Sequence, residues 1–204
     1  MVTKIKDKIV VVGDDKKEHL GLVHVMTGDG RGKTTSSLGL ALRALGSNLR
    51  AYMIQFLKSG TTGEIFSINK YLHGMKIVQF GVDAVRERQQ KLDVFRDKGS
   101  RFIFNPDEEE KEAAILGFQH AKQIINSGEY DLVILDEINV ALDKGLIPMK
   151  EVLDLMDNHG NVELIFTGRD VPEEVIDKAD YVSRVERVKH PWQKGIKARK
   201  GIEY

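Results

Sequence analysis

The sequence lacks cysteine and any long hydrophobic run. With zero cysteines among 204 residues, disulfides, thiolate metal sites and a cysteine nucleophile are excluded, and a reducing compartment is expected. No stretch approaches the roughly 20 apolar residues of a membrane span, and residues 1–8 lack the apolar core of a secretory leader. We therefore expect a cytoplasmic chain that works without a membrane.

The sequence also lacks an excess of either charge. Lys plus Arg and Asp plus Glu each number 31, so a nucleic-acid partner would need a local basic patch, and the sequence shows no strong one. The length suits one α/β domain with a sizeable core and is short for two. We expect a single domain over residues 1–204, with residues 1–20 as an extension or short strand and residues 185–204 as a tail.

Strand and helix patterns alternate along the chain. A helix is expected from Thr34, ending at Gly46 in a left-handed cap, and another from Pro106 behind the N-cap Asn105. The alternation predicts an α/β fold of the P-loop NTPase, RecA-like type, with a mostly parallel sheet and helices on both faces. Apolar runs predict strands at residues 9–12, 22–26, 51–57, 76–80, 131–137 and 162–167. The charged residues 83–98 are expected to form a solvated helix or an excursion.

A glycine-rich run lies between the strand at 22–26 and the helix from Thr34. Its glycines let backbone N–H groups converge on phosphate oxygens, Lys33 adds a mobile charge, and Thr34 offers a hydroxyl to Mg²⁺. The strand-to-helix context disfavours a mere surface turn, so we predict that the run binds the phosphates of ATP. The loop is a variant because its first residue, Thr27, stands where glycine is usual. It reads Thr27-Gly28-Asp29-Gly30-Arg31-Gly32-Lys33-Thr34-Thr35.

Other charged side chains follow predicted strands. Asp136 and Glu137 end the strand at 131–137 and can hold Mg²⁺ directly or through water, although acidic residues can merely terminate a strand. Arg169 follows the strand at 162–167 and either clamps phosphate or is a surface arginine. Arg43, on the first helix, can reach phosphate, but an ion pair is favoured. The spacing does not decide whether Glu137 activates water or holds a metal.

Several separated blocks, in order, resemble the phosphate-loop ATP:corrinoid adenosyltransferases of the cobalamin pathway. The C-terminal block is the most specific, because general ATPases have no reason to end in such a sequence. Only residues from about 70 to 99 do not align well. The matching blocks are the variant loop, Gln55-Phe56-Leu57-Lys58 with Gly63-Glu64, Leu135-Asp136-Glu137, Phe166-Thr167-Gly168-Arg169, Val188-Lys189-His190, Gly195-Ile196-Lys197-Ala198 and Gly201-Ile202-Glu203-Tyr204.

The resemblance implies a cob(I)yrinic acid a,c-diamide or cob(I)alamin adenosyltransferase. Such an enzyme transfers the 5′-deoxyadenosyl group of ATP to Co(I) of a reduced corrinoid and releases triphosphate, in adenosylcobalamin synthesis or salvage. It implies catalytic roles for Lys33, Glu137 and Arg169. Arg43 would also contact ATP, and Thr34, Asp136 and Glu137 would bind Mg²⁺. ATP would run opposite to its usual direction in the loop, which the Thr27 variant fits. A homodimer and a reduced flavoprotein as electron donor are also implied.

Two aromatic residues are candidates for corrinoid contact. The resemblance implies that aromatic side chains remove the lower axial ligand of the cobalt, which eases its reduction. Phe102 and Phe104 are the candidates, and Phe104 stands where the family typically has tryptophan. The alternative is that they alternate along a buried strand.

Two other functions stay open on the sequence. One is a RecA-like ATPase that hydrolyses ATP to drive a partner or a nucleic-acid process, with Glu137 polarising water. Balanced charge weighs against its nucleic-acid form. The other is a regulatory module that binds ATP without chemistry, which leaves the aromatic pair and the tail unexplained.

Overall fold

A computed structural model describes residues 2–5, 8–11, 17–83 and 106–203. Residues 84–98 of the charged segment, the N-cap candidate Asn105 and the corrinoid candidates Phe102 and Phe104 lie outside them. The elements are β1 (Val2–Ile5), β2 (Lys8–Val11), η1 (Lys17–His19), β3 (Val23–Thr27), α1 (Lys33–Leu45), β4 (Ala51–Phe56), α2 (Gly63–Tyr71), β5 (Met75–Phe80), α4 (Pro106–Asn126), β6 (Leu132–Asp136), α5 (Ile138–Asp143), α6 (Met149–Asp157), β7 (Glu163–Thr167), α7 (Glu173–Lys178), β8 (Tyr181–Arg184) and η2 (Pro191–Lys194).

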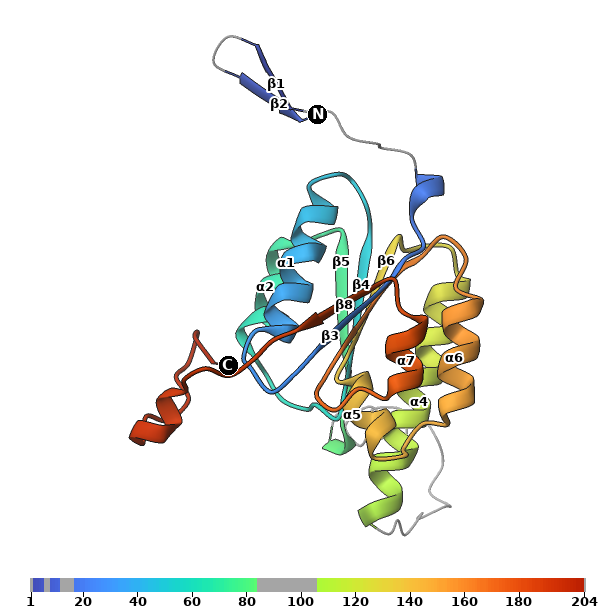
Figure 1. The fold of residues 1–204 in the computed structure, drawn as a ribbon, viewed down its shortest axis with the longest axis vertical. Coiled ribbons are helices and arrows are strands. Elements are labelled where there is room, and N and C mark those ends of the chain that lie inside the picture. The colour runs from blue at the N-terminus through green and yellow to red at the C-terminus, as the bar shows by residue number, and fades with distance from the viewer. Residues whose placement is uncertain (1, 6–7, 12–16, 84–105, 204) are drawn as a thin grey trace, which may run out of the picture.

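A six-stranded parallel sheet forms the centre of the molecule, in the order β5-β4-β6-β7-β3-β8. This confirms the predicted α/β fold with a parallel sheet. The strand expected at residues 9–12 is found as β2, which pairs with β1 in a separate antiparallel hairpin. Figure 1 shows this hairpin away from the main sheet. Because all six strands run the same way, the residues that follow them gather at one edge, called here the carboxyl edge.

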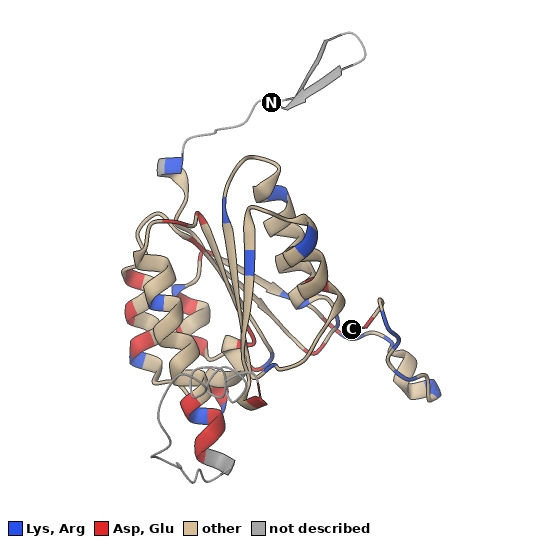
Figure 2. Cartoon of the chain, turned by 180° about the vertical axis from the view of Figure 1, so that it is seen from behind, with Lys and Arg blue, Asp and Glu red and all other residues tan. Residues whose placement is uncertain are grey.

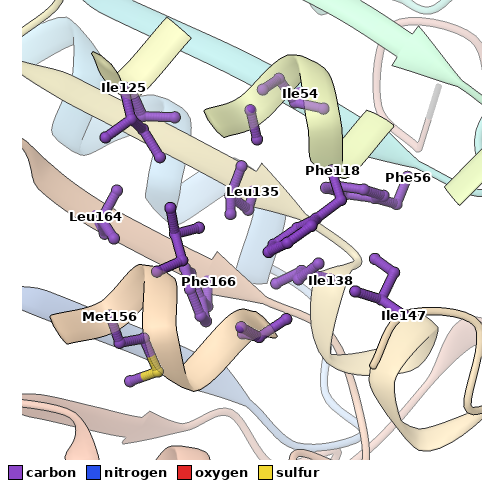
Figure 3. Packing of buried hydrophobic residues seen from close by; sticks show 14 of the residues in the cluster. Ile54, Phe56, Phe118, Ile125, Leu135, Ile138, Ile147, Met156, Leu164 and Phe166 are labelled. Carbon is purple, nitrogen blue, oxygen red and sulfur yellow. The ribbon is translucent and has the colours of Figure 1, made fainter. Parts of the chain in front are cut away.

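Helices cover both faces of the sheet, with α1 and α2 on one face and α4 to α7 on the other (Figure 1). The strands between them are apolar on both faces, as expected for a buried parallel sheet. In β4, Met53 packs toward the α1 side and Ile54 toward the α4 side. Figure 3 shows the α4 side, where Phe118 packs beside Phe56 and Ile138. Each such side chain contributes about 1.5–3 kcal/mol by burial, so the strand ends are firmly held.

Two local features differ from the expectations. Gly46 ends α1 in a right-handed conformation, with φ −63°, and its N–H donates to the carbonyl of Leu42. The expected left-handed cap is therefore wrong, and the nearby left-handed residue is Asn48, with φ 60°. Strand β8 was not predicted, because all four of its residues are exposed at the sheet edge and carry no burial pattern. Within the described residues, every helix is too short or too polar to cross a membrane.

Candidate functional site

The phosphate loop closes around the side chain of Lys33. Its ammonium donates to the carbonyl oxygens of Gly28, at 2.6 Å, and Gly30, at 2.8 Å. Only 7% of this lysine is exposed, and burial lowers its pKa while the charge of Glu137 opposes that shift. Two carbonyl oxygens of the loop therefore satisfy the ammonium of its own lysine.

The chain after β8 lies directly against the phosphate loop. Val185 donates its N–H to the carbonyl of Thr27 and accepts from the N–H of Gly30, both at 2.8 Å. A Cβ on Gly28, whose φ is 96°, would come within 2.4 Å of the Val185 carbonyl oxygen. By contrast, a Cβ on Gly32 would meet nothing within 4 Å, and that position requires glycine only for its φ of 121°. Gly28 is thus required for packing against Val185 as well as for its positive φ, whereas Gly32 is required for its φ alone.

Two predicted ATP ligands of the loop have protein partners. The carboxylate of Asp29 accepts from the backbone N–H of Arg187 and pairs with its guanidinium, both at 3.1 Å. The backbone hydrogen bond from Arg187 is the main cause that holds the pKa of Asp29 below its ordinary value. Arg31 donates to the carbonyl of Ile202 and lies 3.4 Å from Glu203. Ile202 and Glu203, near the C-terminus, therefore contact the loop at Arg31.

Asp136 lies at the centre of a buried hydrogen-bond network. Its side chain is fully buried. The hydroxyls of Thr34 and Thr167 donate to Oδ1 at 2.7 and 2.6 Å, and Gln55 Nε2 donates to Oδ2 at 3.0 Å. Lys58 Nζ donates to Oδ2 at 2.7 Å. The network joins the ends of β4, β6 and β7 to the first turn of α1, as the sheet order allows.

Glu137 is held in an unusual conformation beside Asp136. Its φ is 65°, and its N–H donates to the Thr167 hydroxyl at 3.1 Å. Burial is the main cause that raises the pKa of its carboxyl, followed by the charge of Asp136, whereas Lys58 opposes the shift. Positive φ also occurs at Leu57 and Asp170, after the ends of β4 and β7. Such costly conformations cluster at functional sites, and here they follow three adjacent strands.

Thr34, Asp136 and Glu137 offer oxygen atoms of the kind that Mg²⁺ prefers. The residues that the structure describes contain no group of three or more His, Cys, Asp or Glu side chains able to hold a metal. The hydroxyl of Thr34 would therefore complement the two carboxylates, with water and phosphate oxygens as further ligands. A cation already lies there, since Lys58 Nζ is 2.7 Å from Asp136, 3.4 Å from Thr34 Oγ1 and 3.9 Å from Glu137 Oε1. The donor set thus fits Mg²⁺.

An open pocket of about 440 Å³ lies beside the first half of the loop. Arg169 lines it, as do Arg184 and Arg187, which were not predicted as site residues. Arg184 ends strand β8 and Arg187 follows it three residues later, and neither has a clear signal in the sequence because β8 is fully exposed and was not predicted. The lining includes Thr27, Gly28, Asp29, Arg169, Asp170, Val171, Arg184, Glu186 and Arg187.

Other candidates lie farther from this centre. Arg43 is exposed in the last turn of α1, ten residues or about 15 Å of helix beyond Lys33. Its role on ATP stays a prediction. Thr35 is exposed in the first turn of α1, next to Thr34. Lys58 was missed as a site residue although its block resembled the family, because only the pairing of β4 with β6 brings it to Asp136.

Comparison with known proteins gives a consistent result. Residues 19–204 match the family model described as ATP:corrinoid adenosyltransferase BtuR/CobO/CobP. The chain is 30% identical to the corrinoid adenosyltransferase CobA of Salmonella typhimurium, over 98% of this chain and 94% of that protein. It is also 30% identical to a corrinoid adenosyltransferase of a Sinorhizobium species, over 98% and 86%. A corrinoid adenosyltransferase of Pseudomonas aeruginosa is 29% identical, over 98% and 90%.

Proposed function

The chain belongs to the ATP:corrinoid adenosyltransferase family, and on that premise we propose how its carboxyl edge carries out the reaction. The enzyme transfers the adenosyl group of ATP to a corrinoid. Co(I) attacks C5′ of the ribose and forms the cobalt–carbon bond, while the C5′–O bond breaks and its electron pair leaves with the triphosphate. The family and its named members do not favour the RecA-like hydrolase.

The observation that carries this proposal is the convergence of Lys33 and Asp136 at the phosphate loop. A leaving triphosphate accumulates negative charge, and a buried cation aimed at it stabilises the transition state strongly. We propose that Lys33 exchanges the carbonyls of Gly28 and Gly30 for phosphate oxygens when ATP binds. Arg169, in the adjoining pocket, supplies a second positive charge.

Mg²⁺ is the metal that we propose for Thr34, Asp136 and Glu137. When bound, it would neutralise charge on the triphosphate. Support comes from the hard oxygen donors and from the cation that Lys58 already places among them. Glu137 would then hold metal and would not activate water, which fits a reaction whose nucleophile is cobalt.

The remaining assignments are proposals of the same kind. The phosphate-loop residues Thr27 to Thr35 would contact ATP, with Arg43 as an outlying candidate, and Phe102 and Phe104 would contact the corrinoid. We also propose a single-domain enzyme that acts as a cytoplasmic homodimer and receives electrons from a reduced flavoprotein. The family resemblance supports each of these.

An anaerobic assay tests the function directly. The enzyme, ATP, Mg²⁺ and prereduced cobalamin are mixed, and the corrinoid spectrum and the phosphate product are followed. We expect adenosylated corrinoid and triphosphate, and a loss of about 10²–10³-fold in kcat for Lys33→Met, the order found when one transition-state donor is removed. Lys122→Met is the control, because Lys122 pairs with Glu151 on the outer surface. Orthophosphate without adenosylated corrinoid would contradict the proposal.

A further inference from the structure

Lys58 occupies a position that its neighbours make unusual. Its ammonium lies among the three proposed metal ligands, at 2.7 Å from Asp136 Oδ2, 3.4 Å from Thr34 Oγ1 and 3.9 Å from Glu137 Oε1. Asp136 does not need this lysine to satisfy its oxygens, because Thr34, Thr167 and Gln55 already donate to both of them. What Lys58 adds is positive charge beside two adjacent carboxylates.

The backbone holds Lys58 at this place. Leu57, which precedes it, has a φ of 55°, a left-handed conformation that is costly for a leucine. Gly81 donates its N–H to the Lys58 carbonyl at 2.8 Å, and a Cβ on Gly81 would come within 2.5 Å of that oxygen. A turn at the end of β4 and a close approach from the end of β5 therefore position this side chain together.

The Lys58 side chain can also leave. It is 32% exposed, and its stem is long and flexible. A divalent cation and an ammonium group cannot both lie against the same carboxylate oxygen without strong repulsion. Bound phosphates would give the ammonium another anionic partner next to its present position.

We propose that Lys58 is a built-in substitute for the metal ion in the nucleotide-free enzyme. Its ammonium neutralises Asp136 and Glu137 and excludes a free divalent cation, so that Mg²⁺ enters only together with the phosphates of ATP, which draw Lys58 away. This inference rests on the proposed metal site. Lys58 is thus a positioning residue that makes metal binding conditional on nucleotide.

Binding of Mn²⁺, followed by electron paramagnetic resonance, tests the inference without measuring turnover. We expect the wild type to bind Mn²⁺ weakly alone and tightly with ATP. Without ATP, Lys58→Met should bind Mn²⁺ at least tenfold more tightly than the wild type, and a tenfold change in Kd corresponds to about 1.4 kcal/mol of binding free energy. Adding Asp136→Asn to Lys58→Met should remove this gain. Lys122→Met, which loses the same charge far from the site, should match the wild type.

The outcomes separate the two proposals. If the wild type binds Mn²⁺ with ATP in a manner that Asp136→Asn abolishes, but Lys58→Met shows no gain, the role of Lys58 is overturned and the metal site stands. If Asp136→Asn leaves binding with ATP unchanged, the metal site itself is wrong. Gly81→Ala provides a second variant, since it displaces the Lys58 backbone, and it should shift Mn²⁺ affinity in the same direction by a smaller factor.

Discussion

The carboxyl edge of the sheet and the C-terminal segment, residues 188–203, are opposite kinds of structure. At the edge, Asp136 is fully buried and four side chains donate to it. In the C-terminal segment no residue is buried, and Val188 and Trp192 are 86% and 64% exposed. Figure 1 shows this segment extending away from the sheet, and Figure 2 shows that most of its charged residues are basic.

The two regions differ in how far contacts within the chain account for their residues. Residues at the edge can be explained one by one from the partners that they contact. The C-terminal segment gave the most specific family resemblance, yet its contacts within the described part of this chain are few and mostly local. They include the cap of His190 on η2, the pairing of Arg199 with Glu203, and the contacts of Arg31 with Ile202 and Glu203. We therefore expect its apolar side chains to contact another molecule.

Replacing Asp136 should have the largest effect on the stability of the carboxyl edge. Asp136→Asn places an amide donor among groups that donate, and it leaves Lys58 without its closest partner. We expect the free energy of unfolding to fall by about 3 kcal/mol, as for other broken buried networks. Urea denaturation measures this. Asp157→Asn, which only loosens an exposed pair with Lys178, should change it by less than about 0.5 kcal/mol, and equal effects would contradict the network.

Substitutions at two glycines of the phosphate loop test its contact with Val185, which lies between strand β8 and the C-terminal segment. Alanine at Gly28 or Gly32 has to adopt a positive φ, at a cost of about 1–2 kcal/mol. Only Gly28→Ala also meets the Val185 carbonyl, so it should lose about 1–3 kcal/mol more by overpacking. Thermal unfolding measures both losses of stability. If Gly28→Ala and Gly32→Ala lose the same stability, the backbone at Val185 moves aside without a measurable energetic cost.

The raised pKa of Glu137 predicts a gain in stability when its charge is removed. Burial raises the pKa of the folded protein above the ordinary 4.5, so the ionised carboxylate destabilises the fold at neutral pH, and this cost disappears as the pH falls through the folded-state pKa. Glu137→Gln should therefore stabilise the protein at pH 7, by roughly 0.5–2 kcal/mol, with a smaller gain at pH 5. A gain independent of pH would exclude this cause.

The sequence predicted the fold and the phosphate loop because each rests on local pattern. Apolar strands alternate with helices, and glycines, Lys33 and Thr34 are contiguous. Lys58 and Arg184 were not selected, because their positions depend on which strands are neighbours. The pairing of β4 with β6 brings Lys58 to Asp136, and the pairing of β3 with β8 brings Arg184 beside the loop. Local pattern does not encode strand order, so these residues required the structure.

Removing the C-terminal segment should have the smallest effect on stability. Deletion of residues 188–204 removes no described buried side chain, so we expect the Tm of a dilute sample to change by less than about 2 °C, less than about 1 kcal/mol for a protein of this size. Calorimetry at several protein concentrations sharpens the test. If the full chain gains Tm with concentration and the truncated chain does not, the exposed residues contact a second copy. A loss above about 5 °C at every concentration would mean that the segment packs on its own chain.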